Sequence, residues 1–160
     1  MRNITILFLL AFSIAACTQR ESEADQKKGA YKIGSTGPGG GVIFYVKGNT
    51  YMEISPNLGD YKWSDAIKAA KDYRGGGYTN WYLPSKDELN LAYINWFKSI
   101  HDTGDDDLNF MFSMTVSDVC WSSSEYNSDS AWYQDFIGGD QDKIPKIFRY
   151  GVRAVRTFNP

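Results

Sequence analysis

The sequence predicts an α+β domain in which two helices pack on short, mostly antiparallel strands. Three observations predict this class. Two strand-like runs flank a short turn early in the domain, two segments with helical periodicity follow, and the chain after residue 101 consists of short aromatic or β-branched runs between Ser, Asn, Gly and Asp. A hairpin, then helices, then strands is the element order of the α+β class.

The predicted hairpin follows a glycine-rich stretch, GSTGPGGG. Val42 to Val46 and Tyr51 to Ile54 are strand-like runs, and KGNT between them supplies residues that tolerate a positive φ. Phosphate-cradling loops are also glycine-rich, but they need Lys-Ser/Thr and a helix after the last glycine. Here a strand follows, so we interpret the stretch as a turn that leads into the hairpin.

The first predicted helix lies in KWSDAIKAAKDY. Trp63, Ala66, Ile67 and Ala70 follow the i, i+3, i+4, i+7 spacing of one helix face, which predicts that this face is buried. Ser64 is the expected N-cap, because a serine hydroxyl can accept a hydrogen bond from a free N–H of the first turn.

The second predicted helix begins after Pro84. Ser85 and Glu88 have the S-x-x-E spacing of a capping box. In front of the helix, Trp81 and Leu83 can pack inward, so we interpret GGGYTNWYLPSKDELNLAY as a segment that builds the fold, with Trp81, Pro84, Ser85 and Glu88 as structural residues. The apolar stripe then continues through Leu89, Ala92, Tyr93 and Trp96.

Residues 1–16 are predicted to be a signal peptide of the lipoprotein type. A short n-region with one positive charge precedes an apolar run from Ile4 to Phe12, which is too short to span a bilayer stably. The sequence IAAC then ends at Cys17 and resembles the bacterial lipobox, in which the cysteine is acylated. Cys17 is therefore the predicted lipidation site, and its acyl chains, palmitate among them, would anchor the protein in a membrane.

Residues 17–30 are predicted to be the lipidated cysteine and a flexible tether. The segment after Cys17 is polar and has no aromatic or branched aliphatic residue, so it cannot bury enough surface to offset its ordering entropy. Residues 31–160 are the predicted domain. We expect a protein of the bacterial cell envelope, and Thr18 lacks the aspartate that retains some lipoproteins in the inner membrane, which favours the outer membrane.

Composition argues against several classes of function. The loss of Arg2 leaves 16 Lys and Arg against 19 Asp and Glu, a formal charge of about −3 with His101 neutral, whereas nucleic acid needs a net basic face. With one histidine and, besides Cys17, only Cys120, no catalytic triad or zinc site can be placed by spacing. We therefore predict no catalytic residue, metal ligand or cofactor, and no disulfide.

Charges are segregated along the C-terminal half. Ten carboxylates and no Lys or Arg occur in residues 99–142, and five bases and no acid occur in residues 143–156. Neighbouring strands could pair these charges across a sheet. Alternatively, Asp105–Asp107 or GGDQD could offer oxygen ligands to calcium, although neither matches an EF-hand loop. In a third interpretation the basic segment faces an anionic polymer.

Aromatic residues are the other candidates for ligand contacts. The five tryptophans, Trp63, Trp81, Trp96, Trp121 and Trp132, lie in apolar helical or strand patterns, which favours the core for most of them. We assign Trp121 and Trp132 a structural role. Tyr126, Tyr133 and Tyr150 have more polar neighbours and are the better candidates for an exposed platform.

Four stretches occur in an order that resembles one family. IGSTGPGGGVIFYV, GGGYTNWYLPSKDELNLAY, CWSSSEYNSDSAWYQDF and VRAVRTF are similar to the Lcl C-terminal domain family, the domain that ends a collagen-like bacterial adhesin. The resemblance covers about Lys32 to Phe158. It implies a fold similar to C-type lectin-like domains and to formylglycine-generating enzymes, and binding rather than catalysis, since the best-known relative recognises sulfated glycosaminoglycans as a trimer. A homotrimer is thus one implied partner state.

Two positions depart from the family pattern. Tyr82 stands where the family commonly has arginine, and Cys120 stands where it tends to have an aromatic residue. Formylglycine-generating enzymes use cysteines, so one unpaired cysteine argues against that activity. Arg153 and Arg156 lie in the VRAVR motif, and we expect them to hold the last strand through internal ion pairs.

The leading hypothesis is a lipid-anchored, lectin-like binding and adhesion module for a polysaccharide, an anionic glycan or an envelope or host polymer. Lys143, Lys146 and Arg149 are the predicted basic contacts and Tyr150 the stacking partner, because cations form charge-assisted hydrogen bonds with sulfate, carboxylate or phosphate. The alternatives are calcium-assisted binding of a neutral sugar, an enzyme of the formylglycine-generating type that depends on Cys120, and a structural envelope protein without a small ligand.

Overall fold

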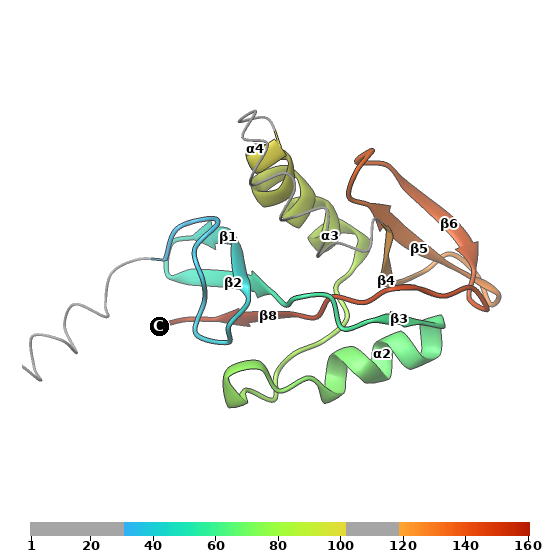
Figure 1. Cartoon of the computed structure of the whole chain (residues 1–160), viewed down its shortest axis with the longest axis horizontal. Coiled ribbons are helices and arrows are strands. Elements are labelled where there is room, and N and C mark those ends of the chain that lie inside the picture. Colours follow the sequence, from blue (N-terminus) through green and yellow to red (C-terminus); the bar gives the residue numbers. More distant parts are fainter. Residues whose placement is uncertain (1–30, 102–118) are drawn as a thin grey trace, which may run out of the picture. The chain divides into compact units, whose positions relative to one another are not determined.

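A computed structural model describes residues 31–101 and 119–160, and Figure 1 shows their helices and strands. The predicted α+β class is confirmed. A β-hairpin comes first, helices follow in the middle of the chain, and most strands come last. In chain order the elements are β1 (Val42–Lys47), β2 (Thr50–Ile54), β3 (Asp60–Tyr61), α2 (Trp63–Asp72), the 3-10 turn η1 (Gly75–Gly77), α3 (Lys86–Ala92), the π-helix η2 (Tyr93–Phe97), α4 (Lys98–His101), β4 (Val119–Glu125), β5 (Ser130–Asp135), β6 (Gln141–Pro145), β7 (Tyr150–Gly151) and β8 (Val155–Phe158).

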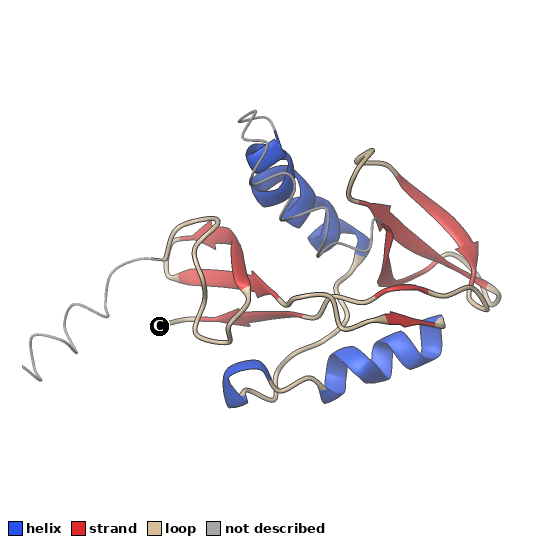
Figure 2. Ribbon diagram, viewed as in Figure 1, coloured by secondary structure: helices blue, strands red, loops and turns tan. Residues whose placement is uncertain are grey.

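The strands form two sheets, which Figure 2 shows in red. The three-stranded sheet has the order β1-β2-β8 and is antiparallel throughout. The five-stranded sheet has the order β3-β7-β4-β5-β6 and is antiparallel except for a single parallel contact, Cys120 with Gly151. The last strand, β8, thus pairs with β2 of the first hairpin, so the first and last strands of the domain belong to one sheet.

The predicted hairpin is confirmed as β1 and β2. Lys47 pairs with Thr50 at its turn, and Gly48 has a φ of 59°, which glycine adopts without the steric cost that a Cβ brings. One irregularity between Ile43 and Tyr45 interrupts the ladder. Such a bulge bends the strand, and β1 is an edge strand of its sheet.

Helix α2 starts two residues earlier than predicted. Its N-cap is Lys62, which makes no capping side-chain hydrogen bond, so the assignment of Ser64 as the N-cap is wrong. The reason is tertiary: the N–H of Trp63 donates to the carbonyl of Lys146, 3.2 Å away, so the turn after β6 satisfies a donor that a cap would otherwise take. Ala66 and Ala70 are fully buried as expected, whereas Ile67 remains 36% exposed.

Helix α3 begins as predicted. The Ser85 hydroxyl accepts from the N–H of Glu88 at 3.2 Å, and the Glu88 carboxylate accepts from the N–H of Ser85 at 2.8 Å, which is a complete capping box. The apolar stripe runs on into the π-helix, where Trp96 is buried. Leu89 and Ala92 are buried as well, so the predicted face of this helix is confirmed.

The core consists of two clusters, one under each helix. Helix α3 and η2 contribute to the first, which lies against the hairpin and contains Phe44, Met52, Ile54, Leu89, Ala92, Trp96, Cys120, Phe136 and Val155. Helix α2 contributes to the second, which contains Ala66, Ala70, Trp81, Leu83, Trp121, Ala131, Val152 and Ala154. Both clusters include residues of β4, because Cys120 and Trp121 point to opposite faces of that strand.

Within the described ranges, no helix is both long and apolar enough to cross a membrane.

Candidate functional site

A partly exposed cluster of rings and lysines lies where the start of α3 meets the five-stranded sheet, and we call its members, Lys86, Tyr126, Trp132 and Lys143, the aromatic–lysine platform. The ammonium of Lys143 lies 4.9 Å from the ring centroid of Tyr126 and 5.7 Å from that of Trp132. Lys86 lies 5.7 Å from the Trp132 ring. The two rings meet edge to face at 5.9 Å, so the four side chains form one surface.

Regular structure holds each member of the platform. Trp132 on β5 stands opposite Lys143 on β6 in the antiparallel register, so their side chains share a face of the sheet. Tyr126 follows β4, and its N–H donates to the carbonyl of Ser130 at 2.9 Å. The N–H of Lys86, at the start of α3, donates to the Ser124 hydroxyl at 3.1 Å.

Two side chains of the platform are well exposed and can contact a ligand. Tyr126 is 53% exposed, and the side chain of Lys143 is 43% exposed. Asp142 lies 3.6 Å from the Lys143 ammonium, and Asp87 pairs with Lys86 at 2.7 Å. Because both carboxylates are exposed, these ion pairs hold the lysines only weakly and can exchange for a ligand anion.

Lys146 has a structural role, contrary to its predicted role as a ligand contact. Its ammonium donates to the Glu125 carboxylate at 2.7 Å and to the carbonyls of Asn127 and Ser128 at 3.0 and 2.9 Å. The same ammonium lies 4.4 Å from the ring centroid of Trp63. All three of its N–H donors are used inside the protein, so no donor is left for a ligand.

Arg149 and Tyr150 lie away from the platform, beside β3. Arg149 is exposed and donates to the carbonyl of Asp60 at 2.6 Å. Tyr150 is half-buried, with its ring 5.1 Å from that of Trp121 and 5.3 Å from that of Tyr133, and burial raises its pKa. Of the three tyrosines proposed as an exposed platform, only Tyr126 is exposed. Tyr133 and Tyr150 pack against the core cluster of α2.

The predicted ion pair of Arg156 is confirmed, and it also explains the glycine-rich stretch. Glu53 pairs with Arg156 in the core, and the Glu53 carboxylate accepts hydrogen bonds from the N–H groups of Gly39 at 3.0 Å and Gly41 at 3.1 Å. The guanidinium stacks on Tyr78 with its carbon 3.6 Å from the ring centroid. The loop does bind an anion through backbone N–H groups, but that anion is a side chain of the same chain.

Arg153 is buried and interacts with the thiol of Cys120. It donates to the carbonyl of Ser55 at 3.1 Å, and burial lowers its pKa while a hydrogen bond and charge interaction with Cys120 act in the opposite direction. Cys120 has no exposed surface. A reacting substrate therefore has no direct access to its sulfur in this structure.

The other residues assigned a structural role are buried or bonded, with one exception. Trp81, Pro84 and Trp121 are buried, and Ser85 and Glu88 form the capping box. The exception is Trp132, which is only half-buried and belongs to the platform. Its strand pattern predicted a buried side chain, but Trp132 lies opposite the exposed Lys143, whereas Gln134 and Phe136 further along the same face are buried.

The two stretches considered for calcium binding are GGDQD and Asp105–Asp107. No group of three or more His, Cys, Asp or Glu side chains that could hold a metal ion occurs in residues 31–101 and 119–160. Within GGDQD, the Asp142 carboxylate accepts the N–H of Lys143 at 2.8 Å, and just before this stretch the Asp135 carboxylate accepts the N–H groups of Ile137 at 2.8 Å and Gly138 at 3.2 Å. Asp105–Asp107 lie outside the described residues.

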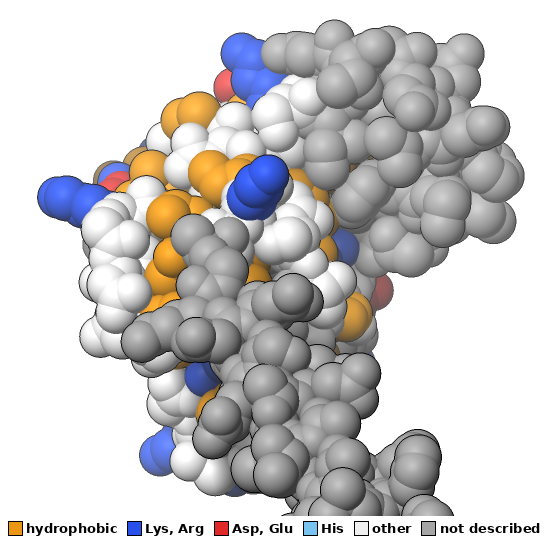
Figure 3. Space-filling view, turned by 90° about the vertical axis from the view of Figure 1, so that its left-hand side faces the viewer, with side chains coloured by type: hydrophobic (Ala, Val, Ile, Leu, Met, Phe, Trp, Pro, Cys, Tyr) orange, Lys and Arg blue, Asp and Glu red, His pale blue; other side chains and the backbone are white. Residues whose placement is uncertain are grey.

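Basic side chains are not gathered on every face of the domain. Figure 3 shows the side of the β1–β2 hairpin, where the Lys and Arg side chains visible outside the grey atoms stand apart from one another. The platform differs, because two lysines from separate elements converge there on one tryptophan ring. Lys86 was missed from the sequence, since its nearness to Trp132 depends on the packing of α3 against β5.

Comparison with known families identifies the domain. The model of the Lcl C-terminal domain matches residues 35–156. The chain belongs to this family. The comparison with curated proteins gives no match. The match to the Lcl C-terminal domain runs from the glycine-rich loop to Arg156, the two segments that Glu53 joins in the core.

Proposed function

We propose that this Lcl C-terminal domain is the binding module of a lipid-anchored envelope protein, that its α+β arrangement is C-type lectin-like, and that its ligand is an anionic glycan. The observation that carries the proposal is the aromatic–lysine platform. Tyr126 and Lys143 are exposed, Trp132 and Lys86 are partly exposed, and the side chains of all four converge on one surface.

The chemistry of the platform fits an acidic sugar. The faces of Tyr126 and Trp132 suit the apolar C–H face of a pyranose ring, and aromatic side chains supply large contact area with little loss of rotamer freedom. Lys86 and Lys143 can each donate charge-assisted hydrogen bonds to a carboxylate or sulfate. A ligand that carries both a sugar face and a negative charge would use all four side chains.

Heparin affinity in rising salt tests the proposal, with the chain from residue 17 onward carrying Cys17→Ser so that no lipid is attached. We expect retention at low ionic strength. The double variant Lys86→Gln/Lys143→Gln should elute at clearly lower salt, and Trp132→Ala should also elute earlier. Lys47→Gln, which removes one exposed lysine from the other sheet, is the matched control and should elute like the parent chain. If the platform variants and the control elute together, the platform is not the glycan site.

The lipid anchor is a separate part of the proposal and rests on the IAAC sequence that ends at Cys17. Metabolic labelling with radioactive palmitate should label the parent chain, and Cys17→Ser should abolish the label and release the protein from the membrane fraction. Label retained in the Cys17→Ser chain would contradict acylation at this cysteine. Density separation of inner and outer membranes then tests the expected outer-membrane location.

A further inference from the structure

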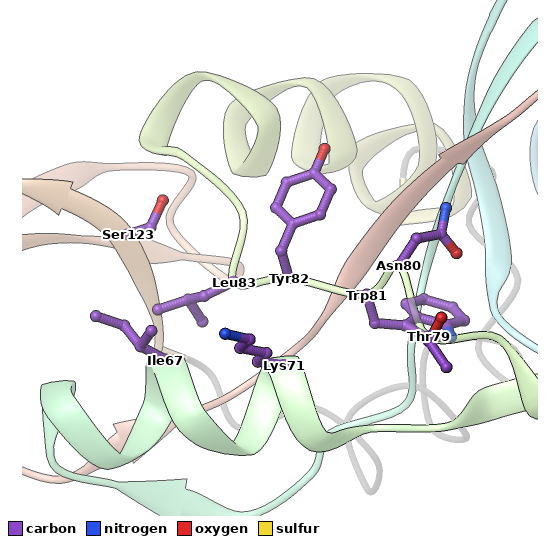
Figure 4. A pocket seen from close by; sticks show the side chains of 8 residues that line it. All are labelled: Ile67, Lys71, Thr79, Asn80, Trp81, Tyr82, Leu83 and Ser123. Carbon is purple, nitrogen blue, oxygen red and sulfur yellow. The ribbon is translucent and has the colours of Figure 1, made fainter.

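A groove that no residue of the platform lines lies between α2 and the extended segment that precedes α3. Its volume is about 400 Å³, which falls in the range of roughly 300–1,000 Å³ that is usual for small-molecule sites. Figure 4 shows Ile67 and Lys71 of α2 on one side and residues 79–83 on the other. Ser123 of β4 closes one end.

The walls of the groove are mainly apolar. Trp81 and Leu83 are almost completely buried and belong to the core cluster beneath it. Ile67 and Tyr82 remain 36% and 37% exposed at the rim. Ile67 lies on the face of α2 that was predicted to be buried, so its exposure comes from the groove itself. An apolar group placed here would cover these side chains.

Lys71 is the only charged side chain among the residues that line this groove. In Figure 4 its ammonium is turned toward residues 82 and 83. None of the ion pairs within the described ranges includes Lys71, whereas Lys68, three residues earlier, pairs with Asp72. The charge of Lys71 is therefore available to a ligand.

The nearby acid does not cancel this charge inside the groove. Glu88 accepts a hydrogen bond from the Tyr82 hydroxyl at 2.7 Å and others from Ser85, on the α3 side of the segment. Burial, together with this hydrogen bond, raises the pKa of Tyr82 to about 12. Tyr82 thus stays neutral at physiological pH and contributes an apolar ring to the rim.

We propose that this groove is a second binding site, which takes a small amphipathic anion. The apolar body of the ligand packs between Ile67 and the Trp81–Leu83 segment, and its carboxylate, sulfate or sulfonate group meets the Lys71 ammonium. Thr79 and Ser123 place hydroxyl groups at the two ends of the groove, where they can bond to polar atoms of the ligand. The site does not depend on glycan binding at the platform.

Fluorescence titration with 1-anilinonaphthalene-8-sulfonate tests the proposal, on the chain from residue 17 onward carrying Cys17→Ser. We expect one saturable site. Lys71→Gln should weaken binding by roughly five- to tenfold, the effect of one exposed charge-assisted contact. Lys68→Gln is the matched control, because it removes a lysine of the same helix that is already paired, and it should leave the affinity unchanged.

Two further measurements separate this site from nonspecific adsorption. The uncharged analogue N-phenyl-1-naphthylamine should bind more weakly and should not respond to Lys71→Gln. In NMR spectra the sulfonate should shift the indole signal of Trp81, whose N–H donates to the Gly75 carbonyl, and leave that of Trp132 in place. Unsaturable binding, equal effects of the two lysine variants, or a shift of Trp132 rather than Trp81 would overturn the proposal. These outcomes leave the platform proposal intact, since heparin retention tests that separately.

Discussion

Two cross-strand pairs show how differently the two sheets use charge. Glu53 on β2 stands opposite Arg156 on β8 in the three-stranded sheet, and both are buried. Trp132 on β5 stands opposite Lys143 on β6 in the five-stranded sheet, and Lys143 remains exposed. Burial of an ion pair is costly unless its remaining atoms find partners. In the first pair the Glu53 carboxylate meets that requirement through the N–H groups of Gly39 and Gly41, and this pair holds the fold. In the second pair, Lys143 is exposed to a ligand.

The glycine-rich loop offsets part of the free-energy cost of burying the Glu53–Arg156 ion pair. Gly39 and Gly41 approach Glu53 closely enough to donate their N–H groups, and Tyr78 covers the guanidinium. One donor, Nη2 of Arg156, has no partner in the described residues. This packing links the start of the domain, the first hairpin and the last strand. A substitution in any one of the three should therefore disturb the packing of the other two.

The largest expected effect is from breaking the buried pair. Glu53→Ala leaves the Arg156 charge uncompensated in the core and releases the two glycine N–H groups, so we expect a loss of about 3–5 kcal/mol in the free energy of unfolding. Urea unfolding followed by tryptophan fluorescence measures it. Glu125→Ala, which removes the exposed partner of Lys146, should cost no more than about 1 kcal/mol. Similar losses in both variants would show that the contrast between the two sheets is wrong.

The next largest loss of stability should come from the glycine-rich loop rather than from the Glu53–Arg156 pair. A Cβ on Gly41 would lie 2.6 Å from the carbonyl oxygen of Ile54, which is strand backbone and cannot move aside. Gly41→Ala should therefore cost about 2 kcal/mol or more. Gly40 faces open space but has a φ of 78°, so Gly40→Ala should cost only about 1 kcal/mol from backbone strain. Thermal unfolding of the two variants compares them, and a reversed order would contradict the close approach to β2.

A smaller effect on stability should distinguish Lys146 from Lys143, which belong to the same basic run. Lys146→Met removes bonds to Glu125, Asn127 and Ser128, and we expect it to cost about 1–2 kcal/mol in the free energy of unfolding. Lys143→Met should change stability by less than about 0.5 kcal/mol, because the side chain is exposed. Heparin elution should respond in the opposite order. If Lys146→Met lowers the eluting salt concentration more than Lys143→Met does, the division between a structural and a ligand-binding lysine fails.

The smallest effect appears only at alkaline pH. Because the folded chain holds the pKa of Tyr82 at about 12 against an ordinary value of 10.0, an unfolded chain gives up this proton first as the pH rises. The stabilisation is therefore complete below pH 10 and is lost between about pH 10 and pH 12. Urea midpoints of Tyr82→Phe should fall less steeply than those of the parent chain across this window. Parallel curves would mean that folding does not raise the pKa of Tyr82.

Elements that depend on near neighbours in the sequence could be predicted from it. The capping box of α3 joins residues three apart, and the β1–β2 hairpin needs only its turn and two short runs. The start of α2 could not be predicted, since the carbonyl that receives the Trp63 N–H belongs to Lys146. Glu53 gave one local signal that was overlooked, a carboxylate between the apolar residues Met52 and Ile54 of a strand.

The sequence by itself determined the α+β class, the hairpin, the capped helix and membership of the Lcl C-terminal domain family, because periodicity, capping and turn chemistry are local properties of the chain. Only the tertiary structure decided which charged side chains bind partners within the protein and which face solvent. Lys143 and Lys146 lie three residues apart in the same basic run, yet one faces two aromatic rings and the other is enclosed by Glu125 and Trp63. Those partners come from distant segments, and their positions are set by how the strands and helices pack.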